Sequence, residues 1–207
     1  GQHYGEDFLG REDDDKRQNG GGVMNRATFT ALTKISDEMI LIQRYYSNGQ
    51  LKYKGYLNEM ASELRSKVNG TKITPKDYVT KDESKEGLVS RWSEDGQIES
   101  EQHFTNGKRN GKFVNWFKNG QIKSKGNFKD EKLDGKVINW FKNGQIESEQ
   151  HYKDGIEDGK MTYWFENGQV RLEQHYKDGK LDGKMTYWFE NGQIRLERNY
   201  KDGERDA

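Results

Sequence analysis

The sequence contains no cysteine and carries no net charge. The absence of cysteine excludes disulfide bonds and thiolate metal ligands. Lysine plus arginine and aspartate plus glutamate are equal at 35 each, so there is no basic field to attract nucleic acid or an anionic membrane. No apolar run approaches the roughly 20 residues that a membrane-spanning helix needs. We therefore expect neither a nucleic-acid partner nor a membrane span.

Hydrophobic residues are scarce too, at 30% of 207 residues, against 34% that are charged. This apolar content argues against a thick two-layer core. Because the chain begins at Gly1 instead of methionine, we expect a mature or trimmed form, and the sequence leaves open whether a signal peptide was removed.

What the sequence does contain is repetition. Five tryptophans stand 24 residues apart, namely Trp92, Trp116, Trp140, Trp164 and Trp188. The unit around them reads G-K-x-x-x-W-F-x-N-G-Q-[IV], then five variable residues, an aromatic and K-D-G-x-x-D-G. A fixed period of this size indicates stacked repeats, and it moves the functional question from a pocket to a surface.

Three regions follow from the distribution of this unit. Residues 1–25 are polar and Gly-rich, and we expect a flexible lead-in. Residues 26–86 form a divergent repeat and capping region, and residues 87–207 form five regular repeats. Within the divergent region, residues 58–68 have the apolar spacing of a short helix, whereas Asn69-Gly70 is also consistent with a plain hairpin, and both alternatives remain.

The recurring Asn-Gly predicts hairpin tips, because both central residues of a type I′ turn need positive φ. Counting outward from a two-residue loop predicts the cross-strand pairs, for example Trp164 with Arg171 and Tyr163 with Leu172. Alternation then divides each hairpin into an apolar core side and a polar side that carries the tryptophan. A three-residue loop with a bulge would shift this division.

A lone hairpin buries too little apolar surface to offset its ordering entropy, so neighbouring repeats must complete the core. We therefore predict an all-β fold, an elongated single-layer antiparallel sheet built as a meander of 24-residue β-hairpin repeats, with either a short inserted helix near 58–68 or a further plain hairpin there. The array reaches Ala207 without a visible cap. An open strand edge there predicts a weak homodimer.

The motifs W/Y-[FY]-x-N-G-Q-[ILV] and Y-K-D-G-K-x-D-G resemble the MORN repeat family, and more closely its bacterial second-type variant. The match is strong over residues 87–207 and weaker over residues 39–57. Bacterial arrays of this kind are often labelled YwqK-family antitoxins, which implies that they bind a toxin protein. Others are similar to exported or surface proteins. The resemblance thus implies a bacterial protein, either cytoplasmic or in the envelope.

No catalytic or cofactor constellation is recognisable, so we expect a non-enzymatic protein. His103, His151 and His175 occupy one repeat position, which indicates a polar surface role instead of a metal site. The doubled Asp-Gly turns lack the ligand spacing of known calcium loops, and tight turns favour Asp-Gly on conformational grounds.

The tryptophans are the main candidate for binding. We predict a partner-binding ladder in which cations stand beside the rings; its residues are Trp116, Trp140, Trp164, Trp188, Arg171 and Arg195. The alternative is that the rings only cover the second face of the sheet. The function favoured is protein binding or scaffolding, with an antitoxin-like role, and an exported protein contacting host or cell-wall components is the alternative.

Overall fold

The computed structural model describes residues 8–11, 29–34, 39–57 and 85–206. It divides the chain into two compact units, Gly1–Lys108 and Arg109–Ala207. All regular secondary structure in the described residues is β-strand, and every strand pair is antiparallel. The prediction of an all-β fold of hairpin repeats is confirmed. The helix expected over residues 58–68 lies outside the described residues.

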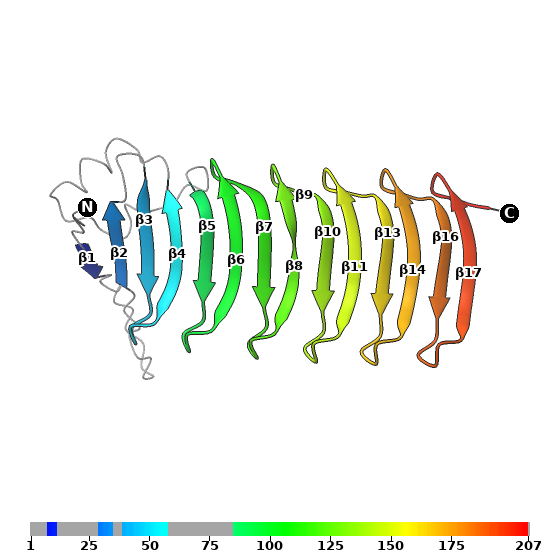
Figure 1. Ribbon diagram of the computed structural model, residues 1–207, viewed down its shortest axis with the longest axis horizontal. Helices are drawn as coiled ribbons and strands as arrows, with labels where there is room; N and C mark the ends of the chain where they lie inside the picture. The colour runs from blue at the N-terminus through cyan, green and yellow to red at the C-terminus, as the bar shows by residue number, and fades with distance from the viewer. Residues whose placement is uncertain (1–7, 12–28, 35–38, 58–84, 207) are drawn as a thin grey trace, which may run out of the picture. The chain divides into compact units, whose positions relative to one another are not determined.

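The first unit contains six described strands (Figure 1): β1 (Phe8–Arg11), β2 (Phe29–Lys34), β3 (Ile40–Tyr45), β4 (Leu51–Leu57), β5 (Lys85–Trp92) and β6 (Ile98–Thr105). Each strand pairs with the next along the chain. β1 lies within the segment expected to be a flexible lead-in, and its four residues pair with β2. The core of this unit consists of Ile40, Ile42, Tyr53, Leu57 and Val89, with Phe104 packed against it.

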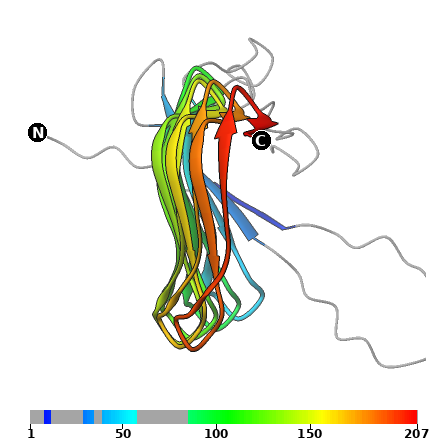
Figure 2. The ribbon, with the colours of Figure 1, turned by 90° about the vertical axis from the view of Figure 1, so that its right-hand side faces the viewer.

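The second unit repeats one pattern of a long hairpin followed by a two-residue strand (Figure 1). Its strands are β7 (Lys108–Trp116), β8 (Ile122–Lys129), β9 (Lys132–Leu133), β10 (Gly135–Trp140), β11 (Ile146–Lys153), β12 (Ile156–Glu157), β13 (Gly159–Trp164), β14 (Val170–Lys177), β15 (Lys180–Leu181), β16 (Gly183–Trp188), β17 (Ile194–Lys201) and β18 (Glu204–Arg205). Its long strands bend along their length (Figure 2).

The Asn-Gly tips have three-residue loops, so the prediction of type I′ turns is wrong. At the tip between β13 and β14, the Phe165 amide donates to the Gln169 carbonyl at 2.8 Å, and the Gly168 amide donates to the Phe165 carbonyl at 2.9 Å. Only the glycine has a positive φ, 84°. The tip is a type I turn followed by a left-handed glycine, a loop that Asn-Gly also suits because Asn167 Oδ1 accepts from the Gln169 amide at 2.9 Å.

The two-residue loops occur instead at the Asp-Gly sequences. Lys153 pairs with Ile156 across Asp154-Gly155, and these two loop residues have φ of 50° and 83°. Positive φ at both positions is the mark of a type I′ turn. The interpretation of this Asp-Gly as turn chemistry is therefore confirmed. The same loop occurs in the next two repeats.

The hairpin bodies have the predicted register, but one position near each tip does not. Tyr163 is opposite Leu172, as predicted, whereas Trp164 is opposite Val170 because the register shifts between Tyr163 and Trp164. Arg171 is thus the extra residue of a β-bulge. The longer loop and the bulge offset each other, which is why a register counted from a two-residue loop is correct for the rest of the hairpin.

Alternation along β13 and β14 defines two faces. The tyrosine face carries Met161, Tyr163, Leu172, Gln174 and Tyr176, and the tryptophan face carries Lys160, Thr162, Trp164, Glu173 and His175. Met161 is 1% exposed and Thr162 is 7% exposed. Both faces are therefore covered at the middle of the strands, including the face expected to be polar.

Candidate functional site

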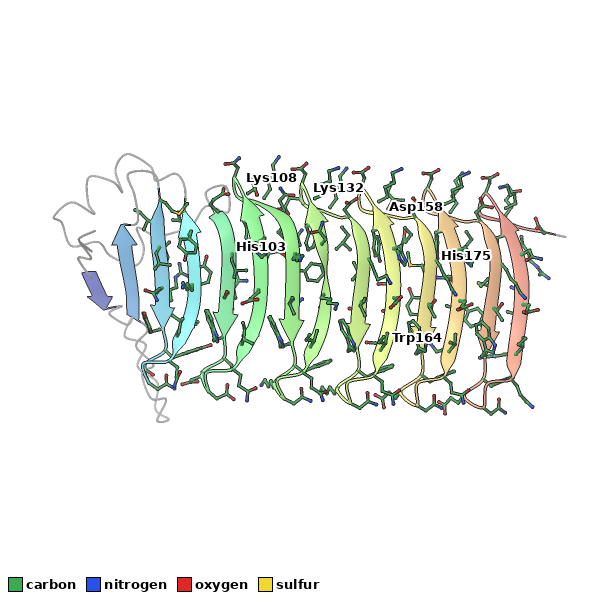
Figure 3. All side chains as sticks on the ribbon, viewed as in Figure 1. His103, Lys108, Lys132, Asp158, Trp164 and His175 are labelled. Atoms are coloured by element: carbon green, nitrogen blue, oxygen red, sulfur yellow. The ribbon has the colours of Figure 1, made fainter. Side chains whose placement is uncertain are left out.

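An apolar ridge crosses the tryptophan face near the Asn-Gly tips in the second unit. In each hairpin a tryptophan stands directly opposite an aliphatic residue: Trp116 with Ile122, Trp140 with Ile146, Trp164 with Val170 and Trp188 with Ile194. We call these eight residues the ridge. Figure 3 shows Trp164 near the tip end of β13, with His175 further from the tip on β14.

The ridge is accessible to a partner. Its tryptophans are half-buried, and Ile122 and Ile194 are 38% and 57% exposed. Equivalent tryptophans are two strand spacings apart, about 9.6 Å, because one strand of the intervening hairpin lies between them. Aliphatic side chains occupy that interval. The sequence analysis missed them because its two-residue loop placed Val170 on the core side.

The cations predicted to stand beside the tryptophans lie elsewhere. Arg171, at the bulge, places its guanidinium over the Tyr163 ring at 5.8 Å, and Arg195 lies over the Phe189 ring at 5.6 Å. In a β-bulge, the extra residue leaves the normal alternation. The predicted pairing of Trp164 with Arg171 is therefore wrong, and these two arginines accompany rings other than the tryptophans.

Rows of cross-strand ion pairs lie beside the ridge on the same face. Lys136 pairs with Glu149 at 3.2 Å, Lys160 with Glu173 at 2.5 Å and Lys184 with Glu197 at 2.5 Å. Each carboxylate belongs to the strand that follows the lysine across an Asn-Gly tip. Partly exposed pairs of this kind contribute about 0.2–1 kcal/mol each. Their regularity gives the face a balanced charge along these repeats.

The repeat formed by β7 and β8 departs from this sequence pattern. Lys112 and Lys125 occupy the positions that hold a lysine and a glutamate in the following repeats. A groove of about 580 Å³ lies here, lined by Lys112, Val114, Lys125, Asn127, Lys136 and Ile138 together with Phe113, Gly126, Asp134 and Gly135. Lys125 Nζ lies 5.3 Å from the centre of the Trp140 ring. The sequence analysis missed this site, although comparing the repeats position by position reveals the substitution.

The recurring histidines form backbone contacts. His151 Nδ1 lies 2.8 Å from the Lys160 carbonyl oxygen, and His175 Nδ1 lies 3.4 Å from the Lys184 carbonyl oxygen. Because a carbonyl only accepts, Nδ1 carries the proton in both rings. Their role is to connect one strand to the next. Within the described part of the chain, no group of three or more histidine, aspartate or glutamate side chains is placed to hold a metal ion.

The tyrosine face contains phenols in a poorly solvated setting. Burial raises the pKa of Tyr152 and of Tyr176, and the nearby Glu157 carboxylate raises both further. Gln150 Nε2 donates to the Tyr163 hydroxyl at 2.7 Å, and Gln174 Nε2 to the Tyr176 hydroxyl at 3.2 Å. Two phenols of this face therefore accept side-chain hydrogen bonds from glutamines.

Comparison with known families agrees with this geometry. The sequence profile described as a MORN repeat variant matches residues 41–59, 85–106, 109–130, 133–154, 157–178 and 181–202. The chain belongs to this family. MORN repeats are generally associated with protein or membrane binding. In the described residues, we find no helix with the length and apolarity needed to cross a bilayer.

Other comparisons are less informative. No curated protein matches the chain. Among solved structures, the chain is similar to one described as the crystal structure of the GtfA/B complex bound to UDP and GlcNAc, with 15% identity and a TM-score of 0.22. That match covers 56% of this MORN chain and 22% of the other, so the chain spans less than a quarter of the protein it matches.

Proposed function

We propose that this MORN array is a non-enzymatic protein-binding module whose ridge is the contact surface. The observation that carries the proposal is the alternation of half-buried tryptophans with aliphatic residues across four hairpins of one face. Contiguous exposed apolar surface on a folded protein marks interaction sites, and tryptophan is enriched among residues that dominate binding energy. The cross-strand ion pairs beside the ridge supply a polar rim.

An antitoxin-like role, in which the partner is a toxin protein, is the specific form of this function that we propose. A single protein retained by the full chain from a lysate of the source cell would provide the partner to be tested. Retention of envelope glycan alone would favour instead an exported protein that contacts host or cell-wall components. The affinity measurements below then decide whether the ridge is the site.

The decisive variant is Trp164→Ser/Trp188→Ser, measured by calorimetry against the purified partner. We expect binding to weaken roughly several hundredfold, because each truncation of an aromatic binding residue costs about 2 kcal/mol or more and the two together cost about 4 kcal/mol. The matched control is Arg171→Ser/Arg195→Ser, which removes two large side chains beside rings other than the tryptophans. We expect this control to bind the partner normally.

A third variant separates loss of the contact from loss of the fold. Ile194 is 57% exposed, so Ile194→Lys leaves the packing of the hairpin largely intact and still places a charge on the ridge. We expect weaker binding with an unchanged melting temperature. Full affinity in both ridge variants, or equal losses in the ridge and arginine variants, would contradict the ridge as the site.

A further inference from the structure

We propose that Asn191 is a site of spontaneous covalent modification, where the side-chain amide is lost through a cyclic succinimide and an aspartate or isoaspartate replaces the asparagine. Asn191 lies in the tip between β16 and β17, and it is exposed together with Gly192. The inference goes beyond the binding function, because the reaction belongs to the chain itself and needs no partner.

The dipeptide Asn191-Gly192 supplies both reacting groups. The main-chain nitrogen of Gly192 gives its proton to solvent base and attacks Asn191 Cγ, so a bond forms between these two atoms while the bond from Cγ to Nδ2 breaks. Nδ2 takes a proton from water and leaves as ammonia. Water then opens the ring at either carbonyl carbon, which gives aspartate or isoaspartate. Glycine favours the attack because it has no Cβ beside the nitrogen.

The folded tip holds these groups in hydrogen bonds. The Gly192 amide donates to the Phe189 carbonyl at 2.9 Å. Asn191 Oδ1 accepts from the Gln193 amide at 3.0 Å. The tip between β13 and β14 has the same two bonds. Attack therefore requires local opening of a tip, and the rate depends on how easily each tip opens.

The two tips differ in what the side-chain amide reaches. Asn167 Nδ2 donates to the main-chain carbonyl of Glu190 in the next tip, at 3.2 Å. Opening the tip of Asn167 therefore breaks a bond to a neighbouring hairpin. Among the described residues, Asn191 Nδ2 donates only to Gln193 Oε1 of its own turn, at 3.4 Å. The tip of Asn191 opens without the loss of such a bond.

Packing at the base of the two tips differs in the same direction. Phe189 is 48% exposed and Ile194 is 57% exposed. The equivalent residues of the preceding hairpin, Phe165 and Val170, are half-buried. A segment with fewer buried apolar contacts opens at a lower free-energy cost. Both observations therefore favour Asn191 over Asn167 as the reactive residue.

Local sequence does not distinguish the two sites. Residues 159–169 and 183–193 are identical and read G-K-M-T-Y-W-F-E-N-G-Q. The two Asn-Gly pairs therefore have the same intrinsic reactivity in the unfolded chain. A difference between their rates in the folded protein comes from the structure, so Asn167 is a matched internal reference for Asn191.

The modification changes the end of the ridge. Either product adds a negative charge to a chain that carries no net charge. Isoaspartate also lengthens the main chain of the loop by a methylene group. This loop connects Trp188 and Ile194, which stand opposite each other across the hairpin. The product is therefore a chemically distinct form of the protein with an altered tip.

The test incubates the full chain, folded, in mildly alkaline buffer and follows both sites by mass spectrometry. Trypsin releases residues 161–171 and 185–195, which differ only in Val170 and Ile194, so each site is read from its own peptide. We expect Asn191 to be converted about two- to tenfold faster than Asn167, the factor by which one net hydrogen bond shifts an opening equilibrium. Equal rates, or faster conversion of Asn167, would overturn the proposal.

A parallel incubation in concentrated urea gives the rates of the unfolded chain. We expect conversion at both sites to become faster and the two rates to become equal, because the surrounding sequences match and the tips no longer protect the asparagines. If Asn191 kept its full advantage over Asn167 in urea, the fold would not be the cause and the proposal would be rejected.

Discussion

The side-chain amide of Asn143 donates a hydrogen bond to the main-chain carbonyl of Glu166, one repeat further along, at 3.1 Å. Its carbonyl oxygen accepts from the Gln145 amide at 2.9 Å within its own turn. Asn119 and Asn167 form the same two bonds in their repeats. One side chain therefore closes a hairpin tip and also joins it to the next tip.

Asn143→Asp tests this connection. Aspartate retains the oxygen that accepts from Gln145 but has no amide to donate to Glu166, so we expect the free energy of unfolding to fall by about 0.5–1.5 kcal/mol. Urea denaturation followed by circular dichroism measures this change. Asn191→Asp is the matched control, because the Asn191 amide reaches only Gln193 of its own turn, at 3.4 Å. Equal losses in the two variants would show that the bond between tips contributes nothing.

A second prediction concerns the exchange of Phe113 and Gly126 for the valine–glutamine pair of the next repeat. A Cβ added at Gly126 would lie 2.7 Å from the Phe113 ring, so Gly126→Gln should destabilise the protein by about 1–3 kcal/mol. In the next repeat, Val137 faces Gln150 at the equivalent positions. Phe113→Val combined with Gly126→Gln should therefore recover much of the loss, as read from the thermal midpoint. Additive losses in the double variant would contradict the pairing.

A third prediction concerns alkaline pH. Burial and Glu157 raise the pKa of Tyr152 and Tyr176 in the folded state, so the unfolded chain loses these phenol protons first as pH rises. The stabilisation is complete below about pH 10 and declines as pH rises above it. Tyr152→Phe/Tyr176→Phe should flatten this decline in urea unfolding measured from about pH 8 to about pH 11. At about pH 8, the difference in free energy of unfolding between the variant and the parent protein gives the packing cost of the two substitutions. If the free energies of unfolding of the two proteins fell in parallel as pH rose, the prediction would be rejected.

The sequence predicted the hairpins, their period and most of the register. It did so because the Asn-Gly and Asp-Gly pairs mark turns and the apolar alternation fixes the body of each hairpin. It assigned the wrong loop to Asn167-Gly168 because that dipeptide is compatible with both loop types. The choice depends on the bulge at Arg171 and on the bond between Asn167 and Gln169, neither of which has a signature in local propensity.

The candidate site was predictable in part for the same reason. The tryptophan column follows from the 24-residue period, and the polar residues beside it follow from alternation. The aliphatic half of the ridge depends on the one-residue shift at each tip, so counting from a two-residue loop moves Val170 to the opposite face. The groove lies where Lys125 replaces the glutamate of the following repeats. Local sequence does not show which residues surround Lys125, because these come from the neighbouring strands β7 and β10.

The spacing of the ridge also bears on the conformation of a segment lying across it. Successive tryptophans repeat at about 9.6 Å, two strand spacings. A polyproline II helix turns once in three residues and about 9.3 Å, so every third side chain faces the same way at nearly this interval. An extended β-strand shows the same side every two residues, about 6.6–6.8 Å, and falls out of step after one tryptophan. The spacing of the ridge tryptophans therefore matches side chains that recur every three residues along a polyproline II segment.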